Sequence, residues 1–461
     1  MRVERREPSA SGWLARLSAG ELSARELAEH YLERIAEVEP RLNAVIAIEP
    51  DAVRSEADAA DAARRTGDSR PLLGLPVTIK DSIEVAGMPC TGGSLARADY
   101  VPDADATVVA RLREAGALVL AKTNVPEYSS SYETDNAVHG RTSNPLDPER
   151  TCGGSSGGEA ALAGADGSPL GIGTDGGGSL RVPAHYCGVV GLRPTVGRVP
   201  DTGTWPSTRA SGYQDLFCVG PIARFVEDVA LVLPVISGPD GIDPYALPAP
   251  LGRPEDVDVS GLSVGWFADD PRLEVTPGTH AALAAAVEGL RAAGADVREV
   301  SAPWDEDPTG LFFDCVAADG GAQPRADVAA AGGNHHPQFQ GLLDAVADRG
   351  VSAADWFEVQ RRVHRLRAAV RGLASTVDLL LCPVVAGPAP LHGTPPGGLP
   401  QESYGEYRAF DYVHLFALGG LPAMSVPAGR EDGMPVGVQL AAAPYREDIV
   451  LAAGAALEEA A

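Results

Sequence analysis

Two serine–glycine stretches hold the residues whose types and spacing could carry out covalent chemistry. Residues 152–159 read Cys-Gly-Gly-Ser-Ser-Gly-Gly-Glu, and residues 171–181 read Gly-Ile-Gly-Thr-Asp-Gly-Gly-Gly-Ser-Leu-Arg. Successive glycines let backbone N–H groups point into one concavity, which is what the developing oxyanion of an acyl transfer needs. Ser179, directly after three glycines, could attack the same carbonyl carbon. An ordinary glycine-rich loop would contain the same residues, so this stretch alone does not establish the chemistry.

A serine nucleophile needs a general base, and histidine is the usual one. The nine histidines are scattered along the chain, and only His185 lies close to Ser179 in the sequence. The neighbours His335 and His336 lack the i, i+4 spacing of a helical zinc site and lie among Gly, Asn and Pro, so we expect them on the surface. We therefore expect no metal site, and His185 is the one histidine worth testing as a base.

Lysine is the other candidate base. Of the 37 lysines and arginines, only Lys80 and Lys122 are lysines. Arginine stays protonated near neutral pH, whereas a buried lysine can lose its proton. Lys80 ends the apolar run Val77-Thr-Ile-Lys80, where burial could lower its pKa by the roughly three units that a base at pH 7 requires, at a cost of about 4 kcal/mol. The hydroxyls of residues 153–158 could relay its proton. A high-GC genome also favours arginine codons, so the scarcity of lysine is not sufficient evidence.

The elements that must position these residues alternate between helices and strands. A strand at Val77–Lys80 would present Lys80, and a strand at Pro169–Ile172 would lead into the glycines before Ser179. Caps and periodicity predict helices from Ser23 to Pro40 and at Asp51–Arg65, Ala106–Ala115, His280–Ala293, Ser352–Arg371 and Glu447–Glu459, and strands at Asn43–Ile48, Ala117–Lys122, Leu262–Phe267, Asp296–Val300, Asp378–Cys382, Met424–Pro427 and Val436–Leu440. This alternation predicts an α/β protein.

Two regions depart from the alternation. Residues 140–220 are rich in Gly, Ser and Thr with few helical repeats, so we expect extended loops that run close together. The Pro/Gly/Asp-rich stretch Gly238–Gly261 is either a linker or an excursion within one domain.

Composition limits the partners and the compartment. The net charge of −26 disfavours nucleic acid and anionic membranes as partners. The six cysteines occur singly, with no CxxC pair, which favours free thiols in a reducing cytoplasm. The N-terminal residues lead into no apolar segment typical of a signal peptide, and no window approaches 18 apolar residues. We expect a cytoplasmic protein with no membrane or nucleic-acid partner.

A set of motifs in order along the chain resembles the amidase signature family. These motifs are Gly74-Leu-Pro-Val-Thr-Ile-Lys80-Asp81, Lys122-Thr-Asn124, Asn144-Pro145, 153–158, 173–181, Cys187–Thr195, Gly220–Arg224, Glu227-Asp228, Gly420–Ala423, Ser425–Pro427 and Pro435–Leu440. The resemblance covers about residue 10 to the end. It implies a single large domain over 1–461, with a central mixed β-sheet covered by helices on both faces. Its parts would be a helical region at about 10–66, a signature core at about 70–237, an excursion at about 238–261 and a C-terminal part at about 262–461 that completes the sheet.

The resemblance also implies roles for individual residues. Lys80 matches the catalytic lysine, Ser155 matches the bridging serine that relatives hold on a cis peptide bond, and Ser179 matches the nucleophile. The remaining matches are Gly176, Gly177, Gly178 and Ser179 as the oxyanion-hole backbone, Ser156 as a supporting hydroxyl, Asp175 and Arg181 as a polar pair flanking the nucleophile loop, and Ser129 in the acyl pocket. The departures from the family pattern are Gly176 for a larger residue, Cys152 for a proline and Arg193 for a lysine; none affects the triad.

The implied function is that of a stand-alone amidohydrolase, which would cleave a small-molecule carboxylic amide without metal or cofactor. The amide and the oligomeric state, including a homodimer, stay open. One alternative is the glutaminase-type subunit of a tRNA-dependent amidotransferase, which has the same triad and needs partner proteins. Another is an α/β-hydrolase esterase with Ser156 as nucleophile, although residues 144–151 make a poor preceding strand. The complete triad disfavours a binding protein without activity.

Overall fold

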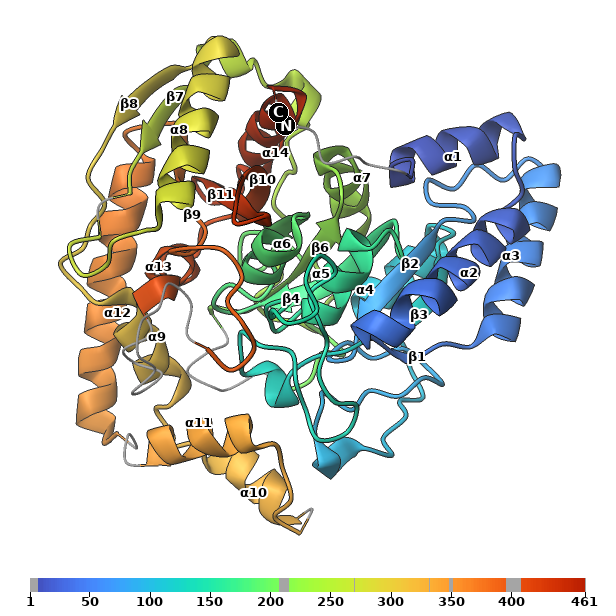
Figure 1. Cartoon of the computed structure of the whole chain (residues 1–461), viewed down its shortest axis with the longest axis horizontal. Helices are drawn as coiled ribbons and strands as arrows, with labels where there is room; N and C mark the ends of the chain where they lie inside the picture. The colour runs from blue at the N-terminus through green and yellow to red at the C-terminus, as the bar shows by residue number, and fades with distance from the viewer. Residues whose placement is uncertain are drawn as a thin grey trace.

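One mixed β-sheet runs through the described part of the chain. The computed structural model describes residues 7–206, 215–268, 270–330, 332–347, 351–394 and 408–460. Eleven strands of these residues pair in the order β1-β3-β2-β4-β6-β5-β10-β11-β9-β7-β8 (Figure 1). Their bounds are β1 Val45–Ala47, β2 Pro76–Lys80, β3 Leu118–Thr123, β4 Leu170–Asp175, β5 Val190–Arg193, β6 Cys218–Ala223, β7 Ser263–Trp266, β8 Asp296–Glu299, β9 Leu379–Pro383, β10 Ala423–Glu431 and β11 Met434–Ala442. The expected α/β fold with a mixed sheet is confirmed.

The strands that matter most for the candidate site are parallel. β2 pairs in parallel with both β3 and β4, so Lys80 at the end of β2 and Asp175 at the end of β4 lie at the same edge of the sheet. β7, α8 and β8 form the predicted βαβ unit, with β7 and β8 parallel. The segment 238–261 connects two regions that belong to this one sheet, and it contains only two short 3₁₀ turns.

Helices cover both faces of the sheet. Along β9, Leu379 and Leu381 pack in the same hydrophobic cluster as residues of α8 and α14, whereas Leu380 and Cys382 pack with α12 and α13. Alternate residues of a strand point to opposite faces, so these helix pairs lie on opposite sides. The helices are α1 Ala10–Ala19, α2 Ala24–Leu42, α3 Pro50–Arg65, α4 Thr107–Glu114, α5 Gly157–Gly164, α6 Arg181–Cys187, α7 Val226–Ile236, α8 Pro277–Ala292, α9 Pro308–Val316, α10 Ala322–Ala330, α11 Pro337–Ala347, α12 Ala353–Ala374, α13 Asp411–Gly419 and α14 Glu447–Ala460.

Several boundaries differ from the sequence-based expectation for identifiable reasons. The Ser23 capping box is confirmed, but α2 continues through Pro40 to Leu42 because the proline sits in the last turn, where Asn43 N–H still reaches the Glu39 carbonyl. The glycine-rich region 140–220 contains the short helices α5 and α6 as well as loops. Both helices are buried on all sides, so they show no amphipathic periodicity that could have predicted them.

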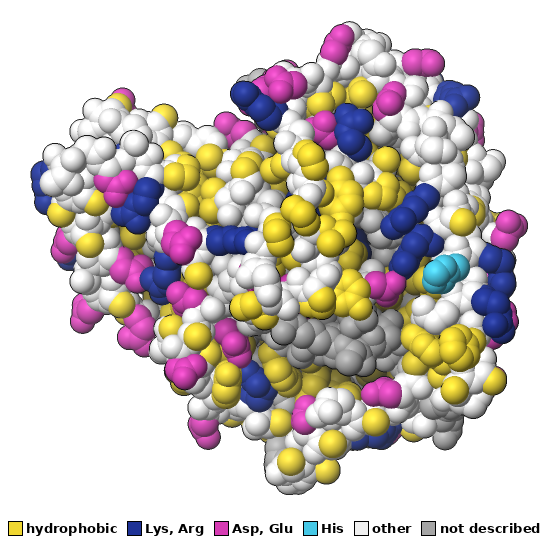
Figure 2. Space-filling model, turned by 180° about the vertical axis from the view of Figure 1, so that it is seen from behind, with side chains coloured by type: hydrophobic (Ala, Val, Ile, Leu, Met, Phe, Trp, Pro, Cys, Tyr) yellow, Lys and Arg dark blue, Asp and Glu magenta, His cyan; other side chains and the backbone are white. Residues whose placement is uncertain are grey.

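The surface described by the structure mixes charges of both signs. On the face shown in Figure 2, Asp and Glu side chains lie scattered among Lys and Arg side chains. Of the helices formed by the described residues, none combines the length and the apolarity that a membrane crossing requires.

Candidate active site

Lys80 lies at the end of β2, fully buried, beside the segment that leads into α5. Its Nζ lies 2.7 Å from Ser155 Oγ and 2.7 Å from Thr174 Oγ1. Burial lowers the pKa of Lys80 to about 7, and the nearby carboxylates of Asp175 and Glu159 only partly oppose this effect. An amine with such a pKa can exchange a proton with a neighbouring hydroxyl at neutral pH.

Ser155 belongs to a loop that lies directly against the Ser179 loop. The Gly154–Ser155 peptide bond is cis, as the resemblance implies for the bridging serine. The N–H of the next residue, Ser156, donates to the carbonyl of Ser179 at 3.1 Å. A Cβ at Gly154 would lie 2.4 Å from the Ser131 carbonyl oxygen, so this close approach requires glycine. The fold therefore brings the two serine–glycine stretches together.

The hydroxyl of Ser156 is held by strand β4. Ser156 Oγ donates to the Thr174 carbonyl at 3.2 Å and accepts from the Thr174 N–H at 3.3 Å. Ser156 is fully buried, and the residues before it form no strand. A buried hydroxyl bonded on both sides is not available to a substrate, so the geometry argues against Ser156 as the nucleophile of an α/β-hydrolase. Its role as a supporting hydroxyl stays a prediction.

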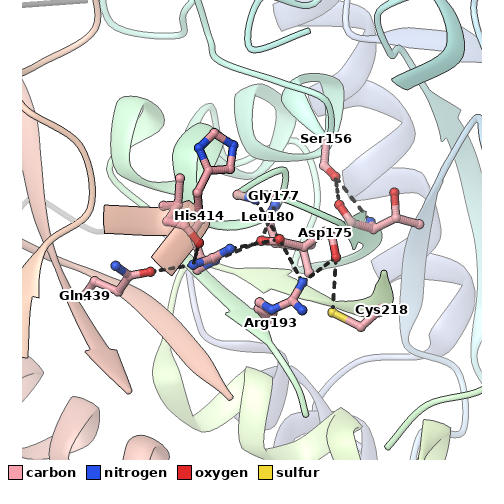
Figure 3. A network of polar contacts seen from close by, with 12 residues as sticks. Ser156, Asp175, Gly177, Leu180, Arg193, Cys218, His414 and Gln439 are labelled. Atoms are coloured by element: carbon pink, nitrogen blue, oxygen red, sulfur yellow. Dashed lines mark hydrogen bonds and ion pairs between the residues drawn. The ribbon is translucent and has the colours of Figure 1, made fainter. Parts of the chain in front are cut away.

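Asp175, the last residue of β4, fixes the loop that follows it (Figure 3). Its carboxylate accepts hydrogen bonds from the N–H groups of Gly178 at 2.7 Å and Leu180 at 3.2 Å. Arg181 Nε lies 2.9 Å and Arg193 Nη1 3.2 Å from the same carboxylate. Burial alone would raise the pKa of Asp175, but the two guanidinium groups outweigh it and hold the pKa well below its usual range. Asp175 therefore stays charged and anchors the loop.

A chain of side chains ending on α13 holds the opposite side of this loop. Tyr132 OH donates to the Gly177 carbonyl at 2.6 Å and lies 2.7 Å from His414 Nε2. Because the phenol proton points to Gly177, His414 donates through Nε2, and its Nδ1 accepts from Thr309 Oγ1 at 2.8 Å. Burial lowers the pKa of His414 to about 3, so this imidazole is neutral at pH 7.

The peptide unit between Gly177 and Gly178 is thus fixed at both ends. Its N–H donates to Asp175, so Gly178 does not offer this N–H to an oxyanion, which corrects the expectation that all four N–H groups of 176–179 form the hole. The N–H groups of Gly176, Gly177 and Ser179 have no acceptor among the described residues. These three are the candidate oxyanion donors.

A cavity of about 560 Å³ opens beside Ser179. Gly177 and Ser179 line one part of it, and the segment Tyr128–Tyr132 lines another. The Oγ of Ser129 is buried with no hydrogen-bond partner among the described residues, and both Tyr128 and Ser129 are left-handed, with φ of 57° and 53°. Such backbone conformations cost about 1–3 kcal/mol each and concentrate at functional sites. Ser129 lines the cavity, and its assignment to the acyl pocket stays a prediction.

The structure does not bring His185 to Ser179 as a base. His185 Nδ1 accepts from the Gly437 N–H at 2.9 Å, so Nε2 carries the proton and donates to the Gly387 carbonyl at 3.1 Å. Burial lowers the pKa of His185 to about 4. Both ring nitrogens are occupied by the backbone, and the residue is structural.

The pair His335 and His336, which we expected on the surface, is half-buried. His336 N–H donates to Glu127 Oε2 at 2.8 Å, and the His335 ring packs edge-on against Phe339. These contacts tie the start of α11 to the segment before Ser129.

Thr174, Tyr132 and His414 are the site residues that sequence reasoning missed. Thr174 lies in the quoted Gly-Thr-Asp motif. The sequence could have predicted its contact with Lys80, because both residues lie near the carboxyl ends of adjacent parallel strands, and these ends meet at one edge of the sheet. His414 is brought in from the C-terminal part of the chain, within a buried helix, and no local pattern marks it.

Comparison with known proteins shows similarity over nearly the whole chain. The model of a protein family described as Amidase matches residues 26–451. The chain is 35% identical to a subunit of the glutamyl-tRNA(Gln) amidotransferase of Thermus thermophilus, covering 97% of this chain and 96% of the relative. It is 34% identical to an indoleacetamide hydrolase of Bradyrhizobium diazoefficiens, covering 98% of this chain and 86% of the relative. The solved structure of a bacterial aryl acylamidase superposes with a TM-score of 0.88 at 28% identity, covering 98% and 96% of the two chains.

Proposed function

This chain belongs to the amidase signature family, and we propose that it hydrolyses a carboxylic amide through an acyl-enzyme on Ser179. The observation that carries the proposal is the buried contact of 2.7 Å between Lys80 Nζ and Ser155 Oγ, with the pKa of Lys80 lowered to about 7. A lysine in this state serves as a general base, and Ser155 lies between it and the nucleophile loop.

The reaction that these residues would perform has two halves. Neutral Lys80 takes a proton from Ser155 as Ser155 takes one from Ser179, and Ser179 Oγ attacks the amide carbonyl carbon. The N–H groups of Gly176, Gly177 and Ser179 stabilise the oxyanion. Ser155 gives its proton to the leaving nitrogen as protonated Lys80 returns one to Ser155, so the amine departs and Lys80 is neutral again. Water passes a proton through Ser155 to Lys80 and attacks the ester of Ser179; Ser179 Oγ then leaves, regains a proton from Lys80 through Ser155, and the carboxylic acid is released.

A fluorophosphonate probe tests the nucleophile directly. We expect one covalent adduct, mapped by mass spectrometry to Ser179, and no labelling of the Ser179→Ala variant. Ser156→Ala is the matched control and should still be labelled. An adduct on Ser156 in the unmodified protein would overturn the proposal and support the esterase alternative.

A second candidate is the glutaminase-type subunit of a tRNA-dependent amidotransferase, because the Thermus thermophilus relative is named as such a subunit. The indoleacetamide hydrolase relative, at nearly the same identity, supports the stand-alone function that we favour. Purifying the chain alone and comparing glutamine with aryl and alkyl amides separates the two. A strong preference for glutamine, or a partner that co-purifies in stoichiometric amount, would favour the role of a complex component.

A further inference from the structure

The cavity at Ser179 extends from the nucleophile to α10 and α11, beyond what a small amide would fill. Its lining includes Phe312 and Phe313 of α9 and Phe339, Leu342 and Val346 of α11. Figure 1 shows α10 and α11 at the margin of the molecule, away from the sheet. The volume of about 560 Å³ falls within the ~300–1,000 Å³ typical of sites for small organic molecules. A substrate such as acetamide would leave most of this space empty.

Aromatic rings form one wall of this cavity. Tyr128 stacks on Phe339 with ring centroids 4.8 Å apart and ring planes within 7°, and its centroid lies 4.4 Å from that of Trp205. Tyr128 OH is held by Asp327 Oδ2 at 2.6 Å, which fixes the ring. Stacked, anchored rings make a rigid apolar surface that favours contact with another ring or a flat apolar group.

The charges on the cavity are negative. Among the described residues that line it, Asp319 and Asp327 are carboxylates and none is Lys or Arg. Asp327 already accepts from Tyr128 and from Gln323 Nε2 at 2.9 Å, and Asp319 accepts from the Gly321 N–H at 2.8 Å. A ligand carboxylate in an apolar site needs a cation or several donors, and like charges nearby add a further cost. This cavity provides the like charges and no described cation.

We infer that the substrate is an amide bearing a bulky aromatic group whose far end is neutral or cationic, and that amides carrying a carboxylate, including free glutamine, are poor substrates. The inference rests on the proposed function of Ser179 and specifies its substrate. Hydrolysis adds one water across the C–N bond and yields an amine and a carboxylic acid.

The test compares kcat/KM of the purified chain for acetamide, glutamine, 2-naphthylacetamide and a naphthylacetamide with a carboxylate on the distal ring. We expect 2-naphthylacetamide to exceed acetamide and glutamine by at least about 100-fold, since each well-placed apolar group contributes up to that order. The carboxylate analogue should fall at least about 10-fold below its neutral parent.

Three variants test which residues cause the expected substrate preference. Leu342→Trp fills the cavity from α11 and should lower kcat/KM for 2-naphthylacetamide about 100-fold while acetamide hydrolysis persists, which also shows that the protein is folded. Asp319→Lys should narrow the gap between the carboxylate analogue and its parent. Phe357→Ala, on α12 and 63% exposed, is the matched control and should change none of these values.

The outcomes distinguish a failure of the inference from a failure of the proposed function on which it rests. If Ser179 is unlabelled by fluorophosphonate and no amide is cleaved, the proposed function fails, and the inference fails with it. If Ser179 is labelled but glutamine or acetamide has a kcat/KM equal to that of 2-naphthylacetamide, the inference alone is overturned. It is also overturned if the carboxylate analogue matches its parent.

Discussion

Lys80 and Lys122 are both fully buried, yet they have different partners. Lys122 Nζ donates to the carbonyl oxygens of Ile83 at 2.6 Å and Pro89 at 3.1 Å, and it lies 3.8 Å from Asp81 Oδ1. Lys80 instead faces two hydroxyls, which can donate or accept and so tolerate a neutral amine. The scarcity of lysine marked both positions, and only the partners distinguish the candidate base from a structural lysine.

Lys80→Arg should lower kcat by about a thousandfold, because a guanidinium does not lose its proton near pH 7 and general-base catalysis contributes about 10²–10⁴-fold. Steady-state kinetics on a cleavable aryl amide measures this loss. Circular dichroism should show that the variant is folded. Activity within tenfold of the unmodified protein would show that Lys80 is not the base.

The pH dependence follows from the lowered pKa of Lys80. Because the neutral amine is the active form, kcat/KM should be constant above a midpoint at about pH 7 and fall towards tenfold per pH unit below it. In Glu159→Gln the midpoint should move lower, since the Glu159 carboxylate raises the pKa of Lys80. A profile that stays flat between pH 5 and 8 would contradict the assignment.

At the scale of elements, the nucleophile loop is held by β4 through Asp175 and by α13 through His414 and Tyr132. Tyr132→Phe removes the donor to the Gly177 carbonyl and should free the loop to reorient its N–H groups. We expect kcat to fall about 10- to 100-fold with little change in KM, and slower labelling of Ser179 by fluorophosphonate. Tyr100→Phe, whose hydroxyl contacts Glu84 on the surface, is the matched control. Unchanged labelling in Tyr132→Phe would assign Tyr132 to packing only.

Strand β4 tolerates only glycine where α5 presses against it. A Cβ at Gly171 would lie 1.9 Å from Glu159 Oε2, and Glu159 is pinned by Thr78 and Thr123 at 2.6 and 2.7 Å. Gly171→Ala should therefore lower the free energy of unfolding by about 2–3 kcal/mol, as overpacked cores do.

Gly341→Ala is the matched control for this substitution. Gly341 lies on the exposed face of α11 with no heavy atom within 4 Å of an added Cβ. Alanine there should add about 0.5–1 kcal/mol through helix propensity. Denaturant unfolding measures the free energy of unfolding of both variants. Equal unfolding midpoints for Gly171→Ala and Gly341→Ala would show that the α5–β4 contact relaxes easily.

The elements that could be predicted from the sequence are those with one buried face and one exposed face. Surface helices such as α2 and α12 show caps and amphipathic spacing, and both capping boxes form as expected. Helices α5, α6 and α13 are buried on all sides, and their composition alone cannot distinguish them from strands or loops. The candidate triad positions could be named because the motifs that carry the family resemblance are local, whereas His414 and Thr309 reach the candidate site only through tertiary packing.

At the scale of the whole molecule, the net charge of −26 bears on the choice between the two candidate functions. We expect the purified chain not to bind tRNA in a filter-binding assay at about 0.15 M salt, because phosphate contacts require clustered Lys and Arg. Figure 2 shows acidic side chains interspersed with the basic ones on that face. Salt-sensitive binding of tRNA by the chain alone would contradict this and favour the amidotransferase alternative.

The cavity itself could not be predicted from the sequence. Its lining combines residues near 128–132, Trp205 and the helices α9 to α11, and these helices were not predicted. Their aromatic residues are no different in sequence from ordinary core residues, and only the fold shows that they face an open space.

The proposed chemistry and the proposed selectivity come from different stretches of the chain. The residues around Lys80, Ser155 and Ser179 come from one stretch, between β2 and β5, whereas the far end of the cavity comes from a second stretch, α9 to α11. The second stretch sits outside the sheet, so its packing does not determine the register of β2 and β4, which position the candidate triad. A lineage, or a protein engineer, could exchange α10 and α11 as a cassette, keep Thr309 of α9 in contact with His414, and so redirect the proposed hydrolytic machinery to a new amide.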